Sequence, residues 1–573
     1  MSEPIDAGGA VAPPPEHRRT LRVGIMGNGR RFPAWQAEAL RALAEIPQVE
    51  LALLIVRGDA TPRRSRLAVL RDRRHLLWTL FNKGYIERRS QASRSTDMTV
   101  ELASVPELRC RTHPVGRYRE RFDDADMAVI ADHRLDVILR FGFGILTGDI
   151  LSCARYGVWS FHHGDERRFR GQPPAFWEMM EGEPVVGVIL QRLTERLDGG
   201  TVLHRGCLKV TGHSYRRTRD DAFFGGSDFP SIVVRQILND DTAAVSAAPS
   251  VTDAPVRRSP TNLAMLRFLA RQAAAFVTSQ VSGVARSAKW SVGIADTPIW
   301  SLLAEPLPAV TWMAEQGRSR YLADPFPDPT GRSDMVLVED YDYDTHRGVI
   351  SAVDMTGNER PRTVLDAGVH ALYPYLFHHD GAIYCMPETY QAEQVRLYRA
   401  VSFPDRWELV ATPLTGIRAL DPTAIQFEDR WWLFCSLEGA YRNIKLHVFH
   451  AAEPCGPWLP HALNPVKTDV RSSRPAGTPF IHDGHLYRPS QDGSVSYGGG
   501  VTINRIDELT PQRFAETTVA RIAPPDTGPY RQGIHTISAH GDRTVVDGRR
   551  DLLIPAGFRR EMSGRLRRLL PGR

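Results

Sequence analysis

The chain has 573 residues and a mass of 64.1 kDa, which at roughly 150 residues per domain predicts two to four domains. Hydrophobic residues make up 42% and charged residues 24%, a composition typical of a globular protein that excludes a disordered or fibrous chain. The formal net charge of +6 is small for this length, so we expect no nucleic-acid partner. The six cysteines form no CxxC pair, which argues against a disulfide scaffold and a structural zinc site, and we expect no metal.

Residues 1–20 are interpreted as a disordered leader, because they lack the apolar core of a secretory signal and are rich in proline and small residues. No run of 18 apolar residues occurs. The nearest candidate, 262–285, carries Arg267, Arg271 and Gln272 about one turn apart, which predicts an amphipathic helix packed on a neighbour and not a membrane span. We therefore expect a cytoplasmic protein.

Strand-like and helix-like segments alternate in the first part of the chain. Apolar strands are expected at 21–27, 49–59, 135–146 and 157–163. Apolar strands without clean alternation, separated by helical segments, are typical of a parallel sheet that is covered on both faces. We predict a Rossmann-like α/β domain over 21–238, followed by a linker and the amphipathic helix over 239–288.

After residue 289 the pattern changes to short aromatic strands that follow acidic or glycine-containing turns. The turns centre near residues 331, 381, 430, 484 and 541. Each is followed by an alternating strand, which indicates a β-hairpin. Five repeats of about 50 residues are typical of a β-propeller, because each four-stranded blade can bury its faces only against neighbouring blades. We predict a five-bladed propeller over 289–556. A basic tail over 557–573 is either solvated or makes a peripheral membrane contact.

Each blade also carries a polar position near the expected centre of the propeller. The innermost strand of a blade delivers residues to the central axis, where a polar side chain is costly unless it pairs or binds a ligand. The candidate axis residues are Asp324, His370, Glu388, Asp421, Arg474, Arg488, Gln491, His535 and Asp547. One interpretation is a carbohydrate-binding site. The other is a ring of salt bridges that ties the strand ends together.

Candidate catalytic residues of the first domain lie between 157 and 203. Ser160 and His162 stand at the end of an expected strand, and Asp198 lies in a later loop that continues with two glycines. In an open α/β sheet, ligands bind at such strand ends. There an imidazole can accept a proton while a carboxylate orients it and favours its charged form.

Residues 21–215, and most specifically 135–203, resemble the folate-dependent formyltransferases, which include the methionyl-tRNA, glycinamide ribonucleotide and sugar N-formyltransferases. The shared features are a strand end of the type Asn-x-His, an Arg-Gly…Pro…Trp-like loop, a Gly-Val-Thr-type strand and an Asp-Thr/Gly-Gly loop. By this resemblance His162 and Asp198 match the catalytic His and Asp. The resemblance also implies a pocket for 10-formyltetrahydrofolate that is walled by Phe143, Gly144, Ile145, Leu146, Leu193 and Thr194.

Ser160 departs from this family pattern, because the family has an Asn there that donates a hydrogen bond to the oxyanion. A hydroxyl reaches less far than an amide, and loss of one oxyanion donor typically costs about 10²–10³ in rate. Either Ser160 itself or a nearby group such as His163 replaces the amide, or the domain is slow or inactive.

The propeller motifs ADPF, MPE, RPAG and YRPSQD resemble the N-terminal domain of glucosamine inositolphosphorylceramide transferases over about 289–552. The arrangement of carboxylates in consecutive blades is also similar to the five-bladed propeller of glycoside hydrolase family 43. Both resemblances imply a module that handles sugars.

Together these resemblances lead us to expect an N-formyltransferase with a carbohydrate-recognising propeller. It would move a formyl group from 10-formyltetrahydrofolate to the amine of an amino sugar or sugar conjugate. The alternative is an inactive formyltransferase-like scaffold that carries a propeller for carbohydrate binding, or one associated with glycosidase or glycosyltransferase activity.

Overall fold

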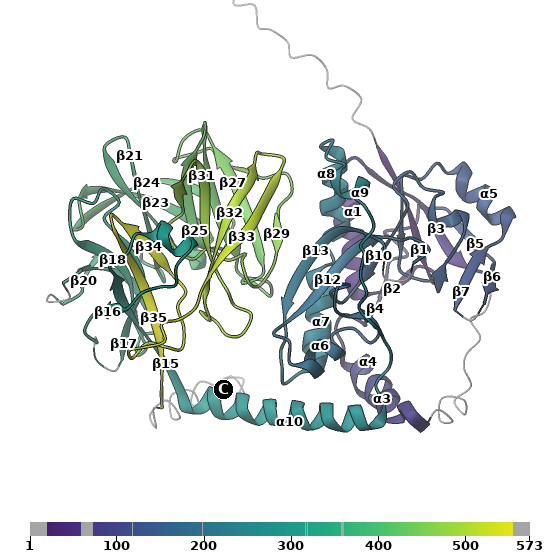
Figure 1. Ribbon diagram of the computed structural model, residues 1–573. Helices are drawn as coiled ribbons and strands as arrows, with labels where there is room; N and C mark the ends of the chain where they lie inside the picture. Colours follow the sequence, from purple (N-terminus) through teal and green to yellow (C-terminus); the bar gives the residue numbers. More distant parts are fainter. Residues whose placement is uncertain are drawn as a thin grey trace, which may run out of the picture.

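The computed structural model describes residues 20–58, 73–116, 118–196, 199–315, 317, 319–356 and 360–553. These residues form an α/β module and a β-propeller, so the fold class expected from the sequence is confirmed. The long helix α10 (Asn262–Ala285) runs from one module to the other along the lower edge of Figure 1. Within the described residues, no helix combines the length and apolar character that crossing a membrane requires.

A seven-stranded sheet in the order β13-β12-β10-β8-β1-β3-β5 forms the centre of the first module. Its strands are β1 (Leu21–Gly27), β3 (Val49–Arg57), β5 (Glu107–Cys110), β8 (Val137–Arg140), β10 (Val158–His162), β12 (Val185–Arg192) and β13 (Thr201–Lys209). The five strands from β10 to β5 are parallel, whereas β12 and β13 are antiparallel to their neighbours. The parallel part confirms the expected sheet, and it brings the ends of β8 and β10 to one edge.

Two hydrophobic cores cover the two faces of this sheet. Successive side chains of a strand point to opposite faces. Ile25 and Leu139 accordingly pack in one core, while Met26 and Ile138 pack in the other. This double burial is the reason why the strands read as continuous apolar runs in the sequence.

Helices and short elements surround the sheet. The α-helices are α1 (Ala34–Ala44), α3 (Leu76–Leu80), α4 (Glu87–Arg89), α5 (Asp124–Asp132), α6 (Phe176–Glu181), α7 (Tyr215–Gly225), α8 (Phe229–Leu238) and α9 (Ala243–Ser246). The 3₁₀-helices η1 (Arg73–His75) and η3 (Asp149–Leu151) and the π-helix η2 (Phe81–Ile86) accompany them. The short strands are β2 (Arg31–Pro33), β4 (Ser95–Asp97), β6 (Thr112–Val115), β7 (Arg119–Phe122), β9 (Ile145–Leu146), β11 (Arg170–Gly171) and β14 (Val256–Arg257).

The second module consists of five sheets, one for each expected blade. The first two blades are β17 (Arg320–Pro327), β18 (Met335–Asp342), β19 (Arg347–Asp354) and β20 (Arg362–Leu365), then β21 (Leu372–His379), β22 (Ala382–Glu388), β23 (Gln394–Ser402) and β24 (Arg406–Thr415). The next two are β25 (Ala419–Phe427), β26 (Arg430–Leu437), β27 (Lys445–Ala451) and β28 (Leu459–Pro460), joined by β29 (Lys467–Thr468), then β30 (Phe480–His482), β31 (His485–Gln491), β32 (Val501–Leu509) and β33 (Phe514–Ile522). The 3₁₀-helix η4 (Ile299–Leu303) lies between β15 and β16 in the chain, and η5 (Tyr390–Ala392) lies between β22 and β23.

The fifth blade closes the propeller with strands from both ends of the module. β34 (Ile537–His540) and β35 (Arg543–Leu553) pair with β15 (Arg286–Ala295) and β16 (Val310–Trp312), which precede the first blade. Each of the five expected turns joins the first and second strands of its blade. The expectation of five blades is thereby confirmed.

The two modules contact each other directly as well as through α10. The backbone N–H of Val470 donates to the carbonyl of Cys207 at 3.0 Å. The ammonium of Lys445 lies 2.7 Å from the carboxylate of Asp228. Val470 also packs into the core of the first module, so the third blade is the side of the propeller that faces the sheet.

Candidate functional site

Three inner strands of the propeller share one backbone irregularity. Asp324, Tyr373 and Asp421 have φ angles of 50°, 44° and 49°, and each precedes a proline. The pairing of the first and second strands of each blade shifts register at these positions, as in a β-bulge. A left-handed residue with a Cβ costs about 1–2 kcal/mol. Because three blades retain this costly feature, we infer that it aims the three side chains at the axis.

The first axial cluster contains Asp324, Glu339, His535 and Asp547, all of them buried. Asp547 accepts the backbone N–H groups of His535 at 2.9 Å and of Asp324 at 3.2 Å. The imidazole Nδ1 of His535 contacts Asp547 Oδ2 and lies 3.9 Å from Asp324 Oδ1. The first and last blades therefore meet in one hydrogen-bonded group.

Burial and like charge raise the pKa values of two acids in this cluster, Asp324 and Glu339. Burial raises the pKa of Asp324; His535 opposes the rise and Asp547 adds to it. Burial also raises the pKa of Glu339, and the neighbouring Asp324 adds to this effect. Burial lowers the pKa of His535, but the carboxylates of Asp547 and Asp324 outweigh burial, so that its pKa is raised. The Asp324–Glu339 pair can therefore hold a proton that two separate carboxylates would lose.

The second axial cluster contains Glu388, Asp421, Arg474 and Gln491. Both carboxylate oxygens of Asp421 accept from Arg474, with Nη2 at 3.0 Å from Oδ1, and Gln491 donates to Oδ2 at 3.0 Å. The N–H of Asp421 donates to Glu388 at 2.9 Å. Burial and the nearby Asp421 raise the pKa of Glu388, although Arg474 opposes the rise. Glu388 is the proton-holding acid of this cluster.

Two aromatic side chains lie over these clusters. The ring of Trp290 stacks on His535 with the centroids 4.0 Å apart. The ring of Tyr497 lies 5.4 Å from the His535 ring and 5.6 Å from the guanidinium carbon of Arg474. Tyr497 is 45% exposed, whereas the charged groups beside it are buried. A ligand that approached the axis from this side would meet Tyr497 first.

His370 and Arg488 do not join the axial clusters, contrary to expectation. His370 accepts the backbone N–H of Gly348 at 2.8 Å, on the third strand of the first blade. Arg488 forms a buried ion pair with Glu516 at 2.7 Å. Arg488 and Gln491 are three residues apart in β31, so their side chains point to opposite faces of the strand and only Gln491 reaches the axis.

Sequence reasoning missed Glu339, Tyr497 and Trp290. Glu339 follows Asp324 by the same number of residues as Glu388 follows Tyr373. An alignment of the blades on their kinked residues could therefore have found Glu339. Tyr497 lies between β31 and β32 and Trp290 lies in β15, and no repeat in the sequence connects them with the axis.

Asp324, His535 and Asp547 also form a possible metal-ligand set. One ligand atom from each lies within 4.8 Å of the others. An imidazole and two carboxylates can bind a divalent transition-metal ion if the imidazole is deprotonated. The expected absence of a metal stays a prediction, because cysteine spacing says nothing about a cluster of this type.

The candidate catalytic residues of the first module lie where β8 and β10 end side by side. Ser160 pairs in register with Arg140, whose Nη1 donates to the Ser160 hydroxyl at 3.0 Å. The imidazole Nε2 of His162 lies 2.9 Å from the carbonyl oxygen of Phe169. Both Ser160 and His162 are buried, and their spacing in β10 places them on one face. Asp198 lies outside the described residues.

The residues expected to wall the folate pocket lie together, but Arg140 and Glu120 already bond to their backbone polar groups. Phe143 and Leu193 pack on the same hydrophobic cluster. Arg140 donates to the carbonyl oxygens of Phe143, at 3.1 Å, and of Gly144, at 2.5 Å, and Glu120 accepts the N–H of Gly144. The backbone N–H and carbonyl of Gly144, an expected wall of the folate pocket, are therefore bonded within the chain.

The other wall residues lie beside this loop. Ile145 and Leu146 form β9, and Leu146 is buried in the same cluster. The N–H of Leu193 donates to Val158 at 2.8 Å, and the hydroxyl of Thr194 donates to the carbonyl of Gly199 at 3.2 Å.

His163 cannot replace the missing amide, contrary to one of the expectations. It follows His162 in the chain and its ring packs against Phe161, Trp35 and Phe223, on the opposite side of the strand. Burial lowers the pKa of His163 to about 3, so the ring is neutral. Arg140, which sequence reasoning missed, is the polar group that touches Ser160 instead.

Glu178 is a second buried acid near this site that sequence reasoning missed. A Cβ built on Gly164 would lie 2.9 Å from His162 Nε2 and 3.5 Å from Glu178 Oε1, so both side chains border this glycine. Burial raises the pKa of Glu178 to about 8, and Oε1 has no hydrogen-bond partner among the described residues. Glu178 is therefore protonated at neutral pH.

Comparisons with known proteins address both modules. Residues 288–528 match the model of the family "Glucosamine inositolphosphorylceramide transferase 1, N-terminal". The rice (Oryza sativa subsp. japonica) protein "Glucosamine inositolphosphorylceramide transferase 1" is 34% identical over 210 residues, which are 35% of this chain and 28% of that protein. The match thus spans less than a third of the plant protein. It confirms that the propeller is similar to this family.

The first module is similar to formyltransferases. The methionyl-tRNA formyltransferase of Methylobacillus flagellatus is 31% identical over 100 residues, which are 17% of this chain and 32% of that protein.

Among solved structures, an exo-β-1,3-galactanase from Clostridium thermocellum covers 39% of this chain and 58% of its own, with 12% identity and a TM-score of 0.28. The fusion of a formyltransferase-like module with a propeller of the plant-transferase type is thereby confirmed.

Proposed function

We propose that this chain is a transferase that acts on a sugar-containing substrate, which it holds at the axis of the propeller. The observation that carries the proposal is the pair of buried carboxyl clusters around Asp324 and Asp421, with Tyr497 at their exposed side. The relatives of both modules are named as transferases, which supports the same general class.

The axial clusters have the chemistry that sugar recognition requires. A sugar presents many hydroxyl groups, which pair with carboxylates, guanidinium groups and amides. Asp421, Arg474 and Gln491 form such a set. The ring of Tyr497, which is exposed, can cover the apolar face of a sugar ring. This part of the proposal does not require that the propeller cleaves a glycosidic bond.

The group that we propose to be transferred is formyl, from 10-formyltetrahydrofolate to the amine of an amino sugar. The donor would be held between Phe143–Leu146 and Leu193–Thr194, whose apolar members share one cluster. When bound, it would supply the formyl group on its N10: a bond from the acceptor nitrogen to the formyl carbon forms, the N10–formyl bond breaks, and N10 takes up a proton as tetrahydrofolate leaves. The hydroxyl of Ser160 can donate a hydrogen bond to developing negative charge, and the guanidinium of Arg140 beside it adds positive charge.

We propose that His162 takes the proton of the attacking amine. The carbonyl of Phe169 is an acceptor, so Nε2 carries the hydrogen in that contact and Nδ1 of the neutral ring can accept a proton. The carboxylate of Asp198, on the matching family position, would favour the charged imidazolium. We place this reaction in the cytoplasm.

A second candidate function has its own observation. Arg140 and Glu120 already occupy the polar groups of Gly144, which favours a first module that serves as a scaffold and binds no folate. In that case the propeller alone would bind or process the sugar.

Calorimetry with 5-formyltetrahydrofolate on the full chain separates the two candidates. We expect micromolar binding to the wild type that weakens in Asp198→Ala. With 10-formyltetrahydrofolate as the donor, tetrahydrofolate release should then appear with a saccharide that carries a free amine and not with its N-acetylated form. Folate binding without release for any glucosamine- or galactosamine-containing saccharide would reject formyl transfer to amino sugars. No folate binding at near-millimolar ligand would support the scaffold.

The sugar site has a test of its own. Asp421→Asn should weaken saccharide binding at least about tenfold, because the loss of one charge-assisted bond typically costs about 1.5–3 kcal/mol. Asp429→Asn, at an exposed turn of the same blade, is the matched control. Equal binding by both variants would remove the axis from the proposal.

A further inference from the structure

Helix α10 has two apolar faces, and one of them is exposed. Met265 and Phe268 are buried in the core of the first module. On the outer side, Leu263, Leu266 and Val277 are 59%, 57% and 60% exposed. A helix that is apolar on both sides normally has a partner on both sides. Among the residues that the structure describes, no partner covers the outer face of α10.

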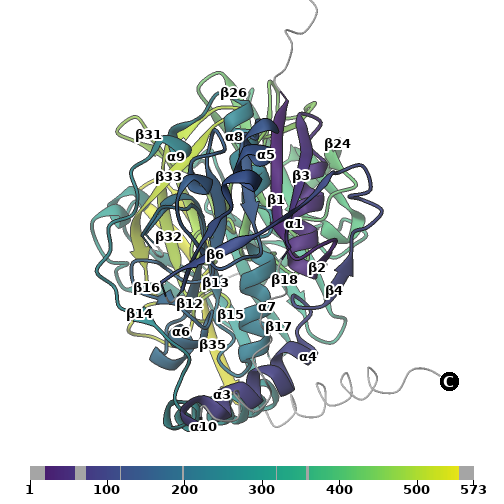
Figure 2. The same cartoon turned by 90° about the vertical axis from the view of Figure 1, so that its right-hand side faces the viewer.

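A neighbouring segment, formed by α3, η2 and α4, extends this surface. The side chain of Asn262, at the start of α10, accepts the N–H of Leu77 at 3.0 Å and donates to the carbonyl of Arg73 at 2.6 Å. Leu80 and Tyr85 of this segment are also exposed. Figure 2 shows α3 and α10 side by side at the lower end of the molecule. We call α10 together with residues 73–89 the basal surface.

The basal surface is basic as well as apolar. Helix α10 contains no acidic residue and carries Arg267 and Arg271, both exposed. The exposed side chains of the 73–89 segment include five basic residues and a single acid. They are Arg73, Arg74, Lys83, Arg88, Arg89 and Glu87. Such a combination of Leu, Phe and Arg on helices that do not span a membrane is typical of segments that lie in the membrane interface.

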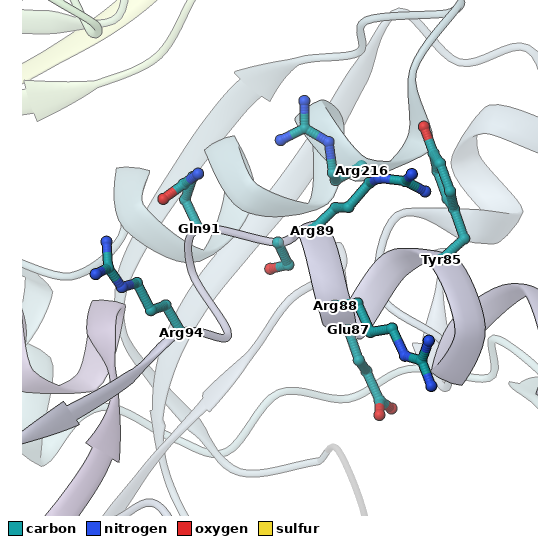
Figure 3. A pocket seen from close by; sticks show the side chains of 8 residues that line it. Tyr85, Glu87, Arg88, Arg89, Gln91, Arg94 and Arg216 are labelled. Atoms are coloured by element: carbon teal, nitrogen blue, oxygen red, sulfur yellow. The ribbon is translucent and has the colours of Figure 1, made fainter.

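A pocket of about 630 Å³ beside α4 concentrates this charge. Figure 3 shows four arginines around it, Arg88, Arg89, Arg94 and Arg216, with Tyr85 close to Arg89. Arg89 lies over the Tyr85 ring at 4.7 Å, and Arg216 is 3.5 Å from Asp220. Arg88 and Arg94 form no ion pair with any residue of the described ranges. The pocket thus has positive charge available for anionic groups such as phosphates.

We propose that the basal surface docks on an anionic phospholipid bilayer. The arginines of the pocket and of α10 would contact the lipid phosphates, while Leu263, Leu266 and Val277 enter the boundary of the acyl region. A second copy of the chain is a poor occupant, because two surfaces of the same positive charge would repel each other. This inference does not depend on the reaction that the chain catalyses. It would place both modules beside a membrane, since α10 runs from one to the other.

Vesicle co-sedimentation of the full chain tests this proposal. We expect binding to phosphatidylcholine vesicles that contain about 30% phosphatidylserine, and at least about tenfold weaker binding to pure phosphatidylcholine, because each basic residue near an anionic surface contributes to attraction. Raising the salt from about 50 to 500 mM should weaken binding by a similar factor, because salt screens the charges. Equal binding to both vesicles, or no binding at low salt, would overturn the proposal.

Two double variants locate the contact. Leu263→Glu with Leu266→Glu, and Arg88→Glu with Arg89→Glu, should each reduce binding at least about tenfold. The matched controls are Leu409→Glu with Leu459→Glu, and Arg332→Glu with Arg531→Glu, at exposed sites on the propeller; these should bind like the wild type. Thermal unfolding establishes that each variant is folded. If the leucine variant is unstable, the arginine variant and the salt dependence still decide.

Two further outcomes would count against the basal surface. Arg567→Glu with Arg568→Glu in the basic tail could abolish binding while both basal variants bind normally, which would assign the contact to the tail. Size-exclusion chromatography with light scattering could show a dimer that the leucine variant dissociates, without binding to vesicles. That result would assign the exposed face of α10 to a second copy of the chain.

Discussion

The two polar sites of this chain are built in different ways. At the propeller axis, side chains from blades that are far apart in the sequence form two clusters. In one cluster Arg474 donates to the carboxylate of Asp421, and in the other His535 contacts the carboxylate of Asp547. At the edge of the α/β sheet, Ser160 and His162 come from one strand, and the groups around them are held by neighbouring side chains such as Arg140. The axis is therefore held by charge pairing between blades, whereas the sheet edge is held by hydrogen bonds from Arg140 to Ser160 and to the loop at Phe143 and Gly144.

Arg474→Ala gives the largest expected effect on the axial side of this comparison. It removes the cation from the buried Asp421 and Glu388, and breaking a buried ion pair typically costs about 3–5 kcal/mol. Urea unfolding measures the loss. Arg430→Ala, which removes an exposed pair with Asp429, should cost less than about 1 kcal/mol. A loss below about 1 kcal/mol for Arg474→Ala would mean that the axial acids become neutral without cost.

Glu178→Gln tests the corresponding buried acid near the sheet edge through its pH dependence. The folded-state pKa of Glu178 is raised from 4.5 to about 8, so the folded protein holds a proton that the unfolded chain has lost between these values. The contribution of Glu178 to the free energy of unfolding should then fall by about 1.4 kcal/mol for each pH unit between pH 5 and 8. The variant lacks this proton, so its stability relative to the wild type should rise over the same range.

Urea unfolding at pH 5 and pH 8 measures this difference. Glu181→Gln, on the same helix but paired with Arg257 at the surface, is the matched control. Parallel stability curves for the wild type and Glu178→Gln would show that Glu178 is ionised throughout, and its proposed neutral state would be wrong.

The difference between the two sites also explains what the sequence could predict. The hairpin turns near 331 and 484 are local features, because acidic and glycine residues specify a turn within a few positions. These turns were sufficient to predict that the propeller has five blades. The strands β15 and β16 of the last blade have no such signal, since β15 joins β35 only through contacts across the whole module and β16 in turn pairs with β15.

The candidate sites follow the same division. Asp324 and Asp421 were predictable because the motif with a following proline recurs from blade to blade. Tyr497 was not, because its contact with Arg474 depends on how a loop folds over the axis. In the first module, the motif around His162 was visible, but the contact of Arg140 with Ser160 arises only when β8 and β10 align in register.

Arg140→Ala sharpens the comparison at the sheet edge. The substitution releases the carbonyl oxygens of Phe143 and Gly144, so we expect 5-formyltetrahydrofolate to bind about tenfold more tightly in calorimetry, which corresponds to about one hydrogen bond to a charged group. Ser160→Ala should leave this affinity unchanged, because the hydroxyl of Ser160 does not touch the loop. Weaker binding in Arg140→Ala would instead make Arg140 a ligand of the folate.

Tyr373→Phe tests why the second blade carries a tyrosine where its neighbours carry aspartates. The Tyr373 hydroxyl accepts the N–H of Gly477 at 2.8 Å and lies 3.0 Å from the Thr423 hydroxyl. Phenylalanine would leave that buried N–H without a partner, at a cost of about 1–3 kcal/mol in unfolding free energy. Tyr487→Phe is the control, since its hydroxyl makes no hydrogen bond in the described part of the chain. If both variants unfold at the same urea concentration, the tyrosine does not join the second and fourth blades, and the axis is held by its charged clusters alone.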